Sequence, residues 1–445
     1  MSKSATETEG YCLVLGGGGA KGVYHIGAAR ALRELGVPIA ACIGNSVGAI
    51  IAAYLAQGLV ERLESIAGTI GFDMVIKVPD GLVRNGAIHL HAGTWDAVRQ
   101  FYRTALRKKG LDTSPLSDLL RADIDEQKIR AGGCDLGLVT FNLTDMKPQE
   151  IFLDQMEVGT LVDYILASSA FPGFSSPHIG GKRYIDGGVY DNIPYRMARR
   201  RGYRKIIVVD ISGIGISRRA DIEGTSTTYI KNSINMGGVM DFDPDFLRRY
   251  SLLGYLDTLR SFGVMQGDHY FIRPDASYEK RFLQAVQIER EGSQKIGRGY
   301  DALARLRAQL PAELSGVRHL LYPFLDCAAS MVKLDRIKEY DPPTLIDAVH
   351  ARMAEEESRV EEIRASLTLT ETQRFTKRIE SLTRKARDIG AFRESPYFYH
   401  QLLEVALKGS LPRLLLKNFR TFYPRVTAGI RCMQLAKVMR DKGVE

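Results

Sequence analysis

The first 60 residues alternate between apolar runs and helical stretches, and each apolar run ends in glycine. Tyr11–Leu15 is followed by four glycines, and Ile39–Ile43 is followed by Gly44. Helical stretches come after both runs, the second from Val47 to Gln57. Because strands that alternate with helices pair in parallel, this pattern predicts an α/β domain with a mainly parallel central sheet. Further strands are expected at Leu136–Phe141, Glu150–Leu153, Arg183–Ile185 and Lys205–Ile211.

Composition is that of an ordinary globular protein. Apolar residues make up 45% of the 445 residues and charged residues 25%, which excludes a mainly disordered chain. The most apolar stretch, Val47 to Val60, is shorter than the roughly 20 residues of a spanning helix. The N-terminus has no apolar core, so we expect no signal peptide, no transmembrane segment and a cytoplasmic location. Five scattered cysteines indicate free thiols rather than disulfides or a zinc site.

The pattern of the sequence changes near residue 310. We expect a flexible N-terminus over residues 1–8, the α/β domain over residues 9–310, and a helical domain over residues 311–445. Apolar residues recur at helical spacing from Leu345 to Leu367, with Thr344 as N-cap, and again from Phe375 to Ile389. These two helices are expected to form a charged helical hairpin. Residues 213–250 show no clear period, which predicts a long surface excursion.

The net charge of +9 is concentrated at the C-terminus. The stretch from Ala391 to Glu445 contains ten basic and four acidic residues, a net charge of +6, which leaves a net charge of +3 for the other 390 residues. Basic and apolar residues are interleaved in Leu411–Tyr423, which suits an anionic membrane surface. We expect peripheral membrane contact through this basic tail and no nucleic-acid partner. The alternative is that the tail packs on the core with its charges in water.

A serine lies where the second strand is expected to turn into a helix. Gly44-Asn45-Ser46-Val47-Gly48 has the GxSxG pattern in the strand–turn–helix context of a nucleophilic serine. The glycines remove Cβ atoms that would collide across so sharp a turn, and the helix N-terminus offers N–H groups to an oxyanion. The motif predicts a serine nucleophile, and an N-cap serine in a tight turn is the alternative.

A glycine loop, Gly17-Gly-Gly-Ala-Lys-Gly22, follows the first strand directly. Consecutive glycines let main-chain N–H groups point into one small space, as an oxyanion hole requires. The loop also satisfies GxGxxG, but the second strand lacks the acidic residue that a dinucleotide site carries at its end. The P-loop pattern fails because Gly22 follows Lys21. An oxyanion loop is therefore the favoured interpretation.

Two more blocks follow in order, Ala167-Ser-Ser-Ala-Phe-Pro172 and Asp186-Gly-Gly188. With the glycine loop and the serine motif, they resemble the patatin-like phospholipase family over about residues 8 to 300. The resemblance implies a patatin-like three-layer domain and a serine acyl hydrolase that cleaves fatty-acyl esters of membrane lipids, of the phospholipase A or lysophospholipase type. It implies Ser46 as nucleophile and Asp186 as base.

The resemblance also implies an oxyanion hole formed by Gly17, Gly18, Gly19 and Val47. Lys21, Phe171 and Phe174 are candidate substrate contacts, and Ile179 could line an acyl groove with the two phenylalanines. No residue cluster requires a metal or a cofactor, because His89 and His91 have no third ligand nearby in the sequence and are read as a surface pair. The resemblance implies a phospholipid or another acyl lipid as the substrate.

A carboxylate is a weak base for a serine at neutral pH, but burial in an apolar cleft would raise the pKa of Asp186 and improve the match. One alternative is a Ser-His-Asp esterase that uses His269, His319, His350 or His400. Another is a catalytically idle scaffold that binds lipid or a protein partner. The sequence leaves the oligomeric state open.

Overall fold

The computed structural model describes residues 10–79, 83–84, 87–88, 110–218, 222–292, 302–316, 318–366, 395–407 and 423–443. The chain divides into two compact units, Met1–Phe262 and Gly263–Glu445. This division falls earlier than the boundary expected near residue 310, because α11 (Ala276–Gly292) packs against α13 (Leu321–Met331) and α18 (Pro424–Asp441). Several expected features lie outside the described residues: the flexible N-terminus, the second helix of the hairpin, His89, His91 and residues 411–422 of the basic tail.

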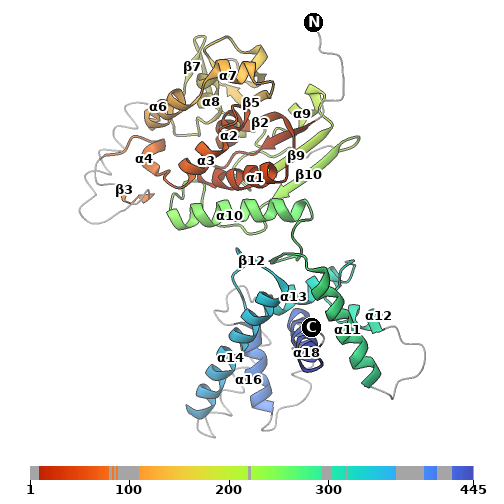
Figure 1. The fold of residues 1–445 in the computed structure, drawn as a ribbon. Helices are drawn as coiled ribbons and strands as arrows, with labels where there is room; N and C mark the ends of the chain where they lie inside the picture. The colour runs from red at the N-terminus through yellow and green to blue at the C-terminus, as the bar shows by residue number, and fades with distance from the viewer. Residues whose placement is uncertain are drawn as a thin grey trace. The chain divides into compact units, whose positions relative to one another are not determined.

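The first unit is built on one mixed sheet (Figure 1). The strand order is β10-β9-β1-β2-β5-β8-β7, and β6 pairs with β5 beside this path. The strands from β10 to β5 run parallel, whereas β6 and β8 pair antiparallel with β5. The bounds are β1 Tyr11–Leu15, β2 Ile39–Asn45, β5 Asp135–Asn142, β6 Lys147–Phe152, β7 His178–Ile179, β8 Lys182–Asp186, β9 Lys205–Asp210 and β10 Ser226–Lys231. The α/β class, the mainly parallel sheet and every expected strand are confirmed.

Helices cover both faces of this sheet (Figure 1). Cys12 and Val14 of β1 share a buried cluster with Tyr195 and Met197 of α9 (Tyr195–Arg201). Because side chains alternate along a strand, the residues between them point to the opposite face, where α1 and α2 lie. The remaining helices of the unit are α1 Val23–Glu34, α2 Val47–Ala56, α3 Val60–Ala67, α4 Phe72–Val75, α6 Ser114–Asp123, α7 Glu126–Ala131, α8 Leu161–Ser168 and α10 Pro244–Ser261. A short hairpin pairs β3 (Val83–Arg84) with β4 (Ala87–Ile88).

The expectation of a surface excursion over residues 213–250 is wrong in two places. β10 adds an edge strand beside β9, and all but one of its residues are exposed or half-exposed, so it carries little apolar signal. α10 begins at Pro244, where Asp243 accepts hydrogen bonds from the N–H groups of Asp245 and Phe246 at 3.0 Å. An N-cap aspartate followed by proline is the signal that could have placed this helix.

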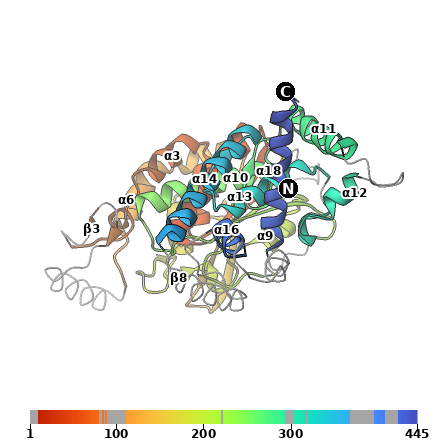
Figure 2. The same cartoon turned by 90° about the horizontal axis from the view of Figure 1, so that it is seen from below.

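The second unit consists mainly of helices around its own buried core. The other α-helices and strands among its described residues are α12 Ala302–Arg307, α14 Pro342–Ser366, α16 Pro396–Leu407 and the paired strands β11 Phe271–Ile272 and β12 Glu339–Tyr340. Within this unit α18 lies between α14 and α11 in both views (Figures 1 and 2). Thr344 is not the N-cap of α14: Asp341 accepts the N–H of Thr344 at 2.9 Å, which places the cap three residues earlier. Across the described residues, every helix is too short or too polar to span a lipid bilayer.

A buried carboxylate connects the first strand of this unit to its last helix. One oxygen of Asp326 accepts the N–H groups of Asp268, His269 and Tyr270 at 2.7–2.9 Å. The other accepts Arg425 Nη1 at 3.0 Å. Asp326 is fully buried, and burial raises its pKa. These contacts give Asp268, His269 and Asp326 a structural reason to lie together.

In the first unit, α1 and α10 approach so closely that glycine is required at the contact. A Cβ on Gly27 would lie 1.9 Å from the Ser251 carbonyl oxygen, and one on Gly254 would lie 2.1 Å from the Tyr24 carbonyl oxygen. Tyr24 also donates its hydroxyl to the buried Asp257 at 2.8 Å. The pair of helices therefore depends on two small residues that helix propensity alone disfavours.

We predict that Gly27→Ala lowers the free energy of unfolding by about 1–3 kcal/mol, because the new methyl group collides with the α10 backbone. Alanine at the matched control Gly68, where a Cβ would have no neighbour closer than 3.6 Å, should change it by less than about 0.5 kcal/mol. Urea unfolding followed by circular dichroism measures both. A Gly27→Ala variant as stable as the wild type contradicts the prediction.

Candidate active site

Ser46 has a backbone conformation that L-residues rarely adopt, with φ 55° and ψ −128°. The turn between β2 and α2 is so tight that a Cβ on Gly44 would lie 2.1 Å from the Gly48 carbonyl oxygen. A Cβ on Gly48 would lie 2.3 Å from the Leu15 carbonyl oxygen. Such a conformation costs about 1–3 kcal/mol and persists only where its surroundings fix it. The strand–turn–helix context expected from the sequence is present.

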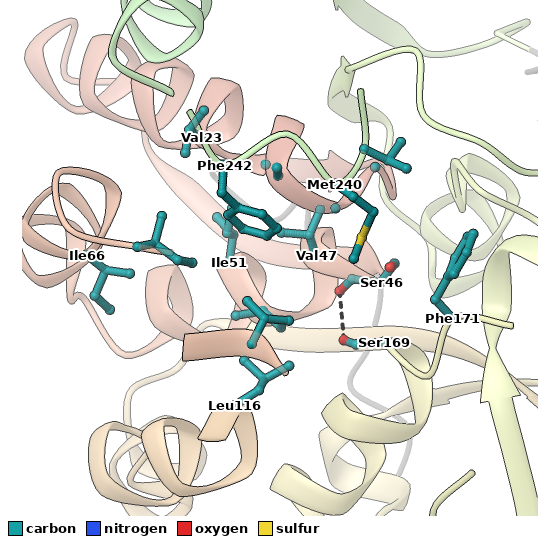
Figure 3. Close-up of a pocket in the computed structure, with 18 of the residues that line it drawn as sticks. Val23, Ser46, Val47, Ile51, Ile66, Leu116, Ser169, Phe171, Met240 and Phe242 are labelled. Carbon is teal, nitrogen blue, oxygen red and sulfur yellow. Dashed lines mark hydrogen bonds between the residues drawn. The ribbon is translucent and has the colours of Figure 1, made fainter. Parts of the chain in front are cut away.

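Two serines at the end of α8 hold the backbone of this turn. Ser168 Oγ accepts the N–H of Ser46 at 3.0 Å and donates to the Val139 carbonyl at 2.6 Å. Ser169 Oγ donates to the Ser46 carbonyl at 3.3 Å (Figure 3). Both serines belong to a block that the sequence analysis identified, but the sequence predicted no role for either of them. Their role appears only once α8 is packed beside β5.

Asp186 ends β8 and lies beside Ser46, 5% exposed. Its Oδ1 accepts the N–H of Gly188 at 2.7 Å and Asn45 Nδ2 at 3.2 Å. Burial raises the pKa of Asp186, and hydrogen bonds from Gly188, the Ser46 side chain and Asn45 offset part of that rise. The direction of the shift is the one that a carboxylate base for a serine needs.

Asn45 links three parts of the site and was not anticipated from the sequence. Its side chain is fully buried, and Nδ2 donates to Asp186 at 3.2 Å and to Asn192 Oδ1 at 3.1 Å. Asn192 in turn donates Nδ2 to the Gly17 carbonyl at 3.2 Å. A continuous set of amide hydrogen bonds therefore joins the carboxylate, the serine turn and the glycine loop.

The glycine loop offers fewer free donors than expected. The N–H of Gly17 is donated to the Asn192 carbonyl at 3.1 Å, so it is not free to bind an oxyanion. The N–H groups of Gly18, Gly19 and Val47 have no hydrogen-bond partner among the described residues. They belong to the first residues of two helical segments, where N–H groups lack an intrahelical acceptor. Gly17 serves instead as a point of close approach, since a Cβ there would lie 3.0 Å from Ser46 Cβ.

A buried histidine supports the start of this loop. His25 Nε2 donates to the Gly16 carbonyl at 2.8 Å, and the side chain is fully buried in α1. Burial lowers the pKa of His25 to about 4, so the ring is neutral near pH 7. The neutral ring satisfies the carbonyl without adding a charge to the core.

We predict that stability falls on acidification because of His25. Its pKa is about 4 when folded against 6.5 in a model compound, so the unfolded chain binds more protons between these values. This difference removes about 3 kcal/mol of unfolding free energy as the pH falls from about 7 to about 4. Urea unfolding at several pH values measures it. The slope should be smaller in His25→Asn, and an equal slope in both proteins contradicts the prediction.

Ser46 borders an apolar pocket of about 1140 Å³, a volume that includes its open mouth (Figure 3). Asp186 borders the same pocket. Beyond these two and a few polar groups, its walls are aliphatic and aromatic side chains from α2, α3, α6 and the segment that precedes α10. Phe171 and Phe174 line it, as expected from the sequence. Representative wall residues are Val23, Val47, Ile51, Ile66, Leu116, Met240 and Phe242.

Two expected contacts lie elsewhere. Lys21 is not among the residues that line the pocket; it is 5% exposed and donates Nζ to Asn235 Oδ1 at 3.0 Å. Burial lowers the pKa of Lys21. Ile179 belongs to β7 and is also absent from the lining. Lys21 therefore connects the glycine loop to the segment before α10 and does not face the pocket.

The histidines considered as alternative bases all belong to the second unit. Among the described residues that line the pocket there is no histidine. His319 lies beside Glu279 at 3.0 Å, and His269 lies beside Asp268 at 3.4 Å. Asp186 is the carboxylate among the described lining residues, and it lies beside Ser46.

Comparison with known families gives this arrangement a context. The family model "Patatin-like phospholipase" matches residues 13–199, which include the glycine loop, Ser46 and Asp186. This chain carries a patatin-like phospholipase domain. The resemblance expected from the four blocks is confirmed, and the matched residues run from within β1 to within α9.

The curated relatives are much longer proteins. "Patatin-like phospholipase domain-containing protein 6" of Mus musculus is 27% identical over 275 residues, which are 59% of this chain and 18% of that protein. "Lysophospholipase NTE1" of Cryptococcus neoformans is 26% identical over 331 residues, 68% of this chain and again 18% of the relative. The match to the solved structure of VipD from Legionella pneumophila covers 97% of this chain and 91% of the VipD chain, at 13% identity and a TM-score of 0.38.

Proposed function

We propose that the patatin-like domain hydrolyses fatty-acyl esters of lipids through an acyl-enzyme on Ser46, with Asp186 as the base. The observation that carries the proposal is the position of Ser46 and Asp186 together at the border of an apolar pocket. A strained serine, a buried carboxylate and free N–H groups are the parts that acyl transfer needs. The pocket supplies an environment for a chain of methylene groups.

In the first step Ser46 Oγ attacks the ester carbonyl carbon while Asp186 takes its proton. The negative charge that develops on the carbonyl oxygen is stabilised by the N–H groups of Gly18, Gly19 and Val47. Asp186 then gives the proton to the departing alcohol oxygen, and the acyl group stays on Ser46. Water repeats the sequence: Asp186 takes a proton from it, the acid leaves, and Ser46 is restored.

The pocket indicates which part of a lipid it accepts. Among the described lining residues there is no lysine, arginine or histidine, so a charged head group finds no cation there. The polar lining groups include Ser46, Ser169, Asp186 and Asn192. We infer that the acyl chain enters the pocket and the head group stays outside. A relative is named a lysophospholipase, which makes a single-chain phospholipid the first substrate to test.

We predict that Ser46→Ala and Asp186→Asn each lower kcat/KM about a thousandfold or more, because each removes a group that makes or breaks bonds. The assay measures fatty acid released from lysophosphatidylcholine and alcohol released from a short-chain chromogenic ester. Loss of both activities in both variants is the expected result. Activity that survives Ser46→Ala contradicts the proposed nucleophile.

Two matched controls separate chemistry from folding. Ser212 shares the positive φ of Ser46, at 51°, but does not line the pocket, so Ser212→Ala should stay active. Asp191 is 1% exposed, and burial raises its pKa to about 6, yet it too is absent from the lining. Asp191→Asn should therefore stay active. An inactive Asp191→Asn variant together with an active Asp186→Asn variant would instead identify Asp191 as the base.

A second prediction concerns the pH profile. Asn45→Leu removes a hydrogen bond that favours the charged form of Asp186, so the pKa of this carboxyl rises further above its ordinary value. Because the base must be deprotonated, the acid limb of kcat/KM moves to higher pH. An unchanged acid limb, in a variant whose melting temperature shows that it is folded, contradicts the role of Asp186.

The competing proposal is a domain that binds lipid without cleaving it. Wild-type protein that is inactive on both esters but retains a fatty acid would support this alternative. The free N–H groups beside Ser46 favour hydrolysis, because binding of an acyl chain alone does not require them.

A further inference from the structure

Exposed apolar side chains gather around the mouth of the pocket. Ten large apolar side chains are exposed among the described residues, and four of them belong to the mouth or to the loops beside Asp186. Two line the pocket directly, Ile214 at 66% and Met240 at 38% exposure. Ile216 at 54% exposure follows Ile214 by two residues, and Val189 at 37% follows Gly188, whose carbonyl accepts the N–H of Ile216. We call these four residues the apolar rim.

The segment that carries two of these residues is built to face outward. Residues 213–216 read Gly-Ile-Gly-Ile. A Cβ on Gly213 would lie 1.8 Å from the Gly17 carbonyl oxygen, and one on Gly215 would lie 2.9 Å from the Gly188 carbonyl oxygen. The glycines therefore pack against the backbone of the site. The isoleucines that follow the two glycines are 66% and 54% exposed, so both side chains reach the surface of the unit.

Backbone hydrogen bonds fix this segment to the loop that follows the carboxylate. The N–H of Ile216 is donated to the Gly188 carbonyl at 2.8 Å, and the Ile216 carbonyl accepts the N–H of Asn192 at 2.7 Å. Val189 follows Gly188 directly. The exposure of Ile216 and Val189 is therefore a property of an ordered part of the site.

An amphipathic pair borders the apolar rim. The Arg218 guanidinium lies 4.2 Å over the ring of Tyr190, and Arg218 Nε donates to the Tyr190 carbonyl at 3.0 Å. Aromatic and basic side chains with an apolar body and a polar tip are common at the boundary between lipid tails and head groups.

We propose that the apolar rim docks the first unit on a phospholipid surface by inserting Ile214, Ile216, Val189 and Met240 among the lipid tails. The inference rests on the proposed function, because it assumes that an acyl chain enters by this mouth. A lipid surface is the occupant that the geometry favours, since a protein partner or a second copy seated there would close the mouth. Docking through the rim is driven by apolar burial, so it depends little on salt.

This surface differs from the basic tail that the sequence favoured. Two of the tail's cations are engaged in ion pairs within the second unit. Arg425 pairs with the buried Asp326 at 3.0 Å, and Arg431 donates Nη1 to Glu289 at 2.8 Å. A surface that depended on these cations would lose binding at high salt, which the rim does not predict.

The test uses the full chain with Ser46→Ala, so that binding is measured without hydrolysis. Co-sedimentation with phosphatidylcholine vesicles is compared for this protein, for added Ile216→Ser and for added Ile222→Ser, at about 0.1 M and about 0.5 M NaCl. Ile222 is a matched control because it is 58% exposed and precedes β10, away from the pocket lining. We expect Ile216→Ser to weaken partitioning about tenfold at both salt concentrations and Ile222→Ser to leave it unchanged.

A second readout locates the contact. The chain has one tryptophan, so an Ile216→Trp variant adds a single new emitter, and an Ile222→Trp variant is its control. A blue shift on adding vesicles, confined to the Ile216→Trp variant, supports insertion of the rim. Equal binding of all variants, or binding that disappears at the higher salt concentration, overturns the proposal.

Failure of the proposed function gives a different result. With Ser46 left intact, the single variant Ile216→Ser should hydrolyse a soluble short-chain ester as fast as the wild type. Only its rate of hydrolysis on vesicles should fall. A wild-type protein inactive on every ester that still binds vesicles through Ile216 refutes hydrolysis and leaves the docking surface in place.

Discussion

The site depends on one constraint, the strained backbone of Ser46 between β2 and α2. A positive φ is costly for a serine, and the chain accepts it only because glycines at positions 44 and 48 let the strand and helix touch. The turn places the Ser46 side chain at the pocket and leaves the Val47 N–H without a partner among the described residues. The proposed nucleophile and one proposed oxyanion donor are consequences of the same turn.

Around this turn, buried polar groups are arranged so that each fixes another. Asn45 donates to Asp186 and Asn192, and Asn192 holds the Gly17 carbonyl. In a buried environment such hydrogen bonds are worth more than in water, and an unpaired member costs correspondingly more. The network therefore orients Asp186 while burial raises its pKa, which gives the carboxylate both the position and the basicity that the proposed chemistry needs.

The pocket and the apolar rim separate two tasks that a lipid hydrolase must perform. In the proposed function the pocket takes the acyl chain, and in the proposed docking the rim meets the lipid surface from which that chain comes. Gly213 and Gly215 make this possible, because they let the segment with Ile214 and Ile216 lie against the backbone of the site.

The sequence by itself determined the α/β class, every strand that we expected, the serine turn and the family, because these follow from local periodicity and from glycines at fixed spacing. It misplaced the N-cap of α14 and overlooked β10 and α10, where apolar signals are weak. Tertiary structure alone decided that Lys21 faces Asn235, that Gly17 has no free N–H, and that Asn45, Ser168 and His25 support the site. Their partners lie on other strands and helices, so only the packed fold brings these groups within hydrogen-bonding distance.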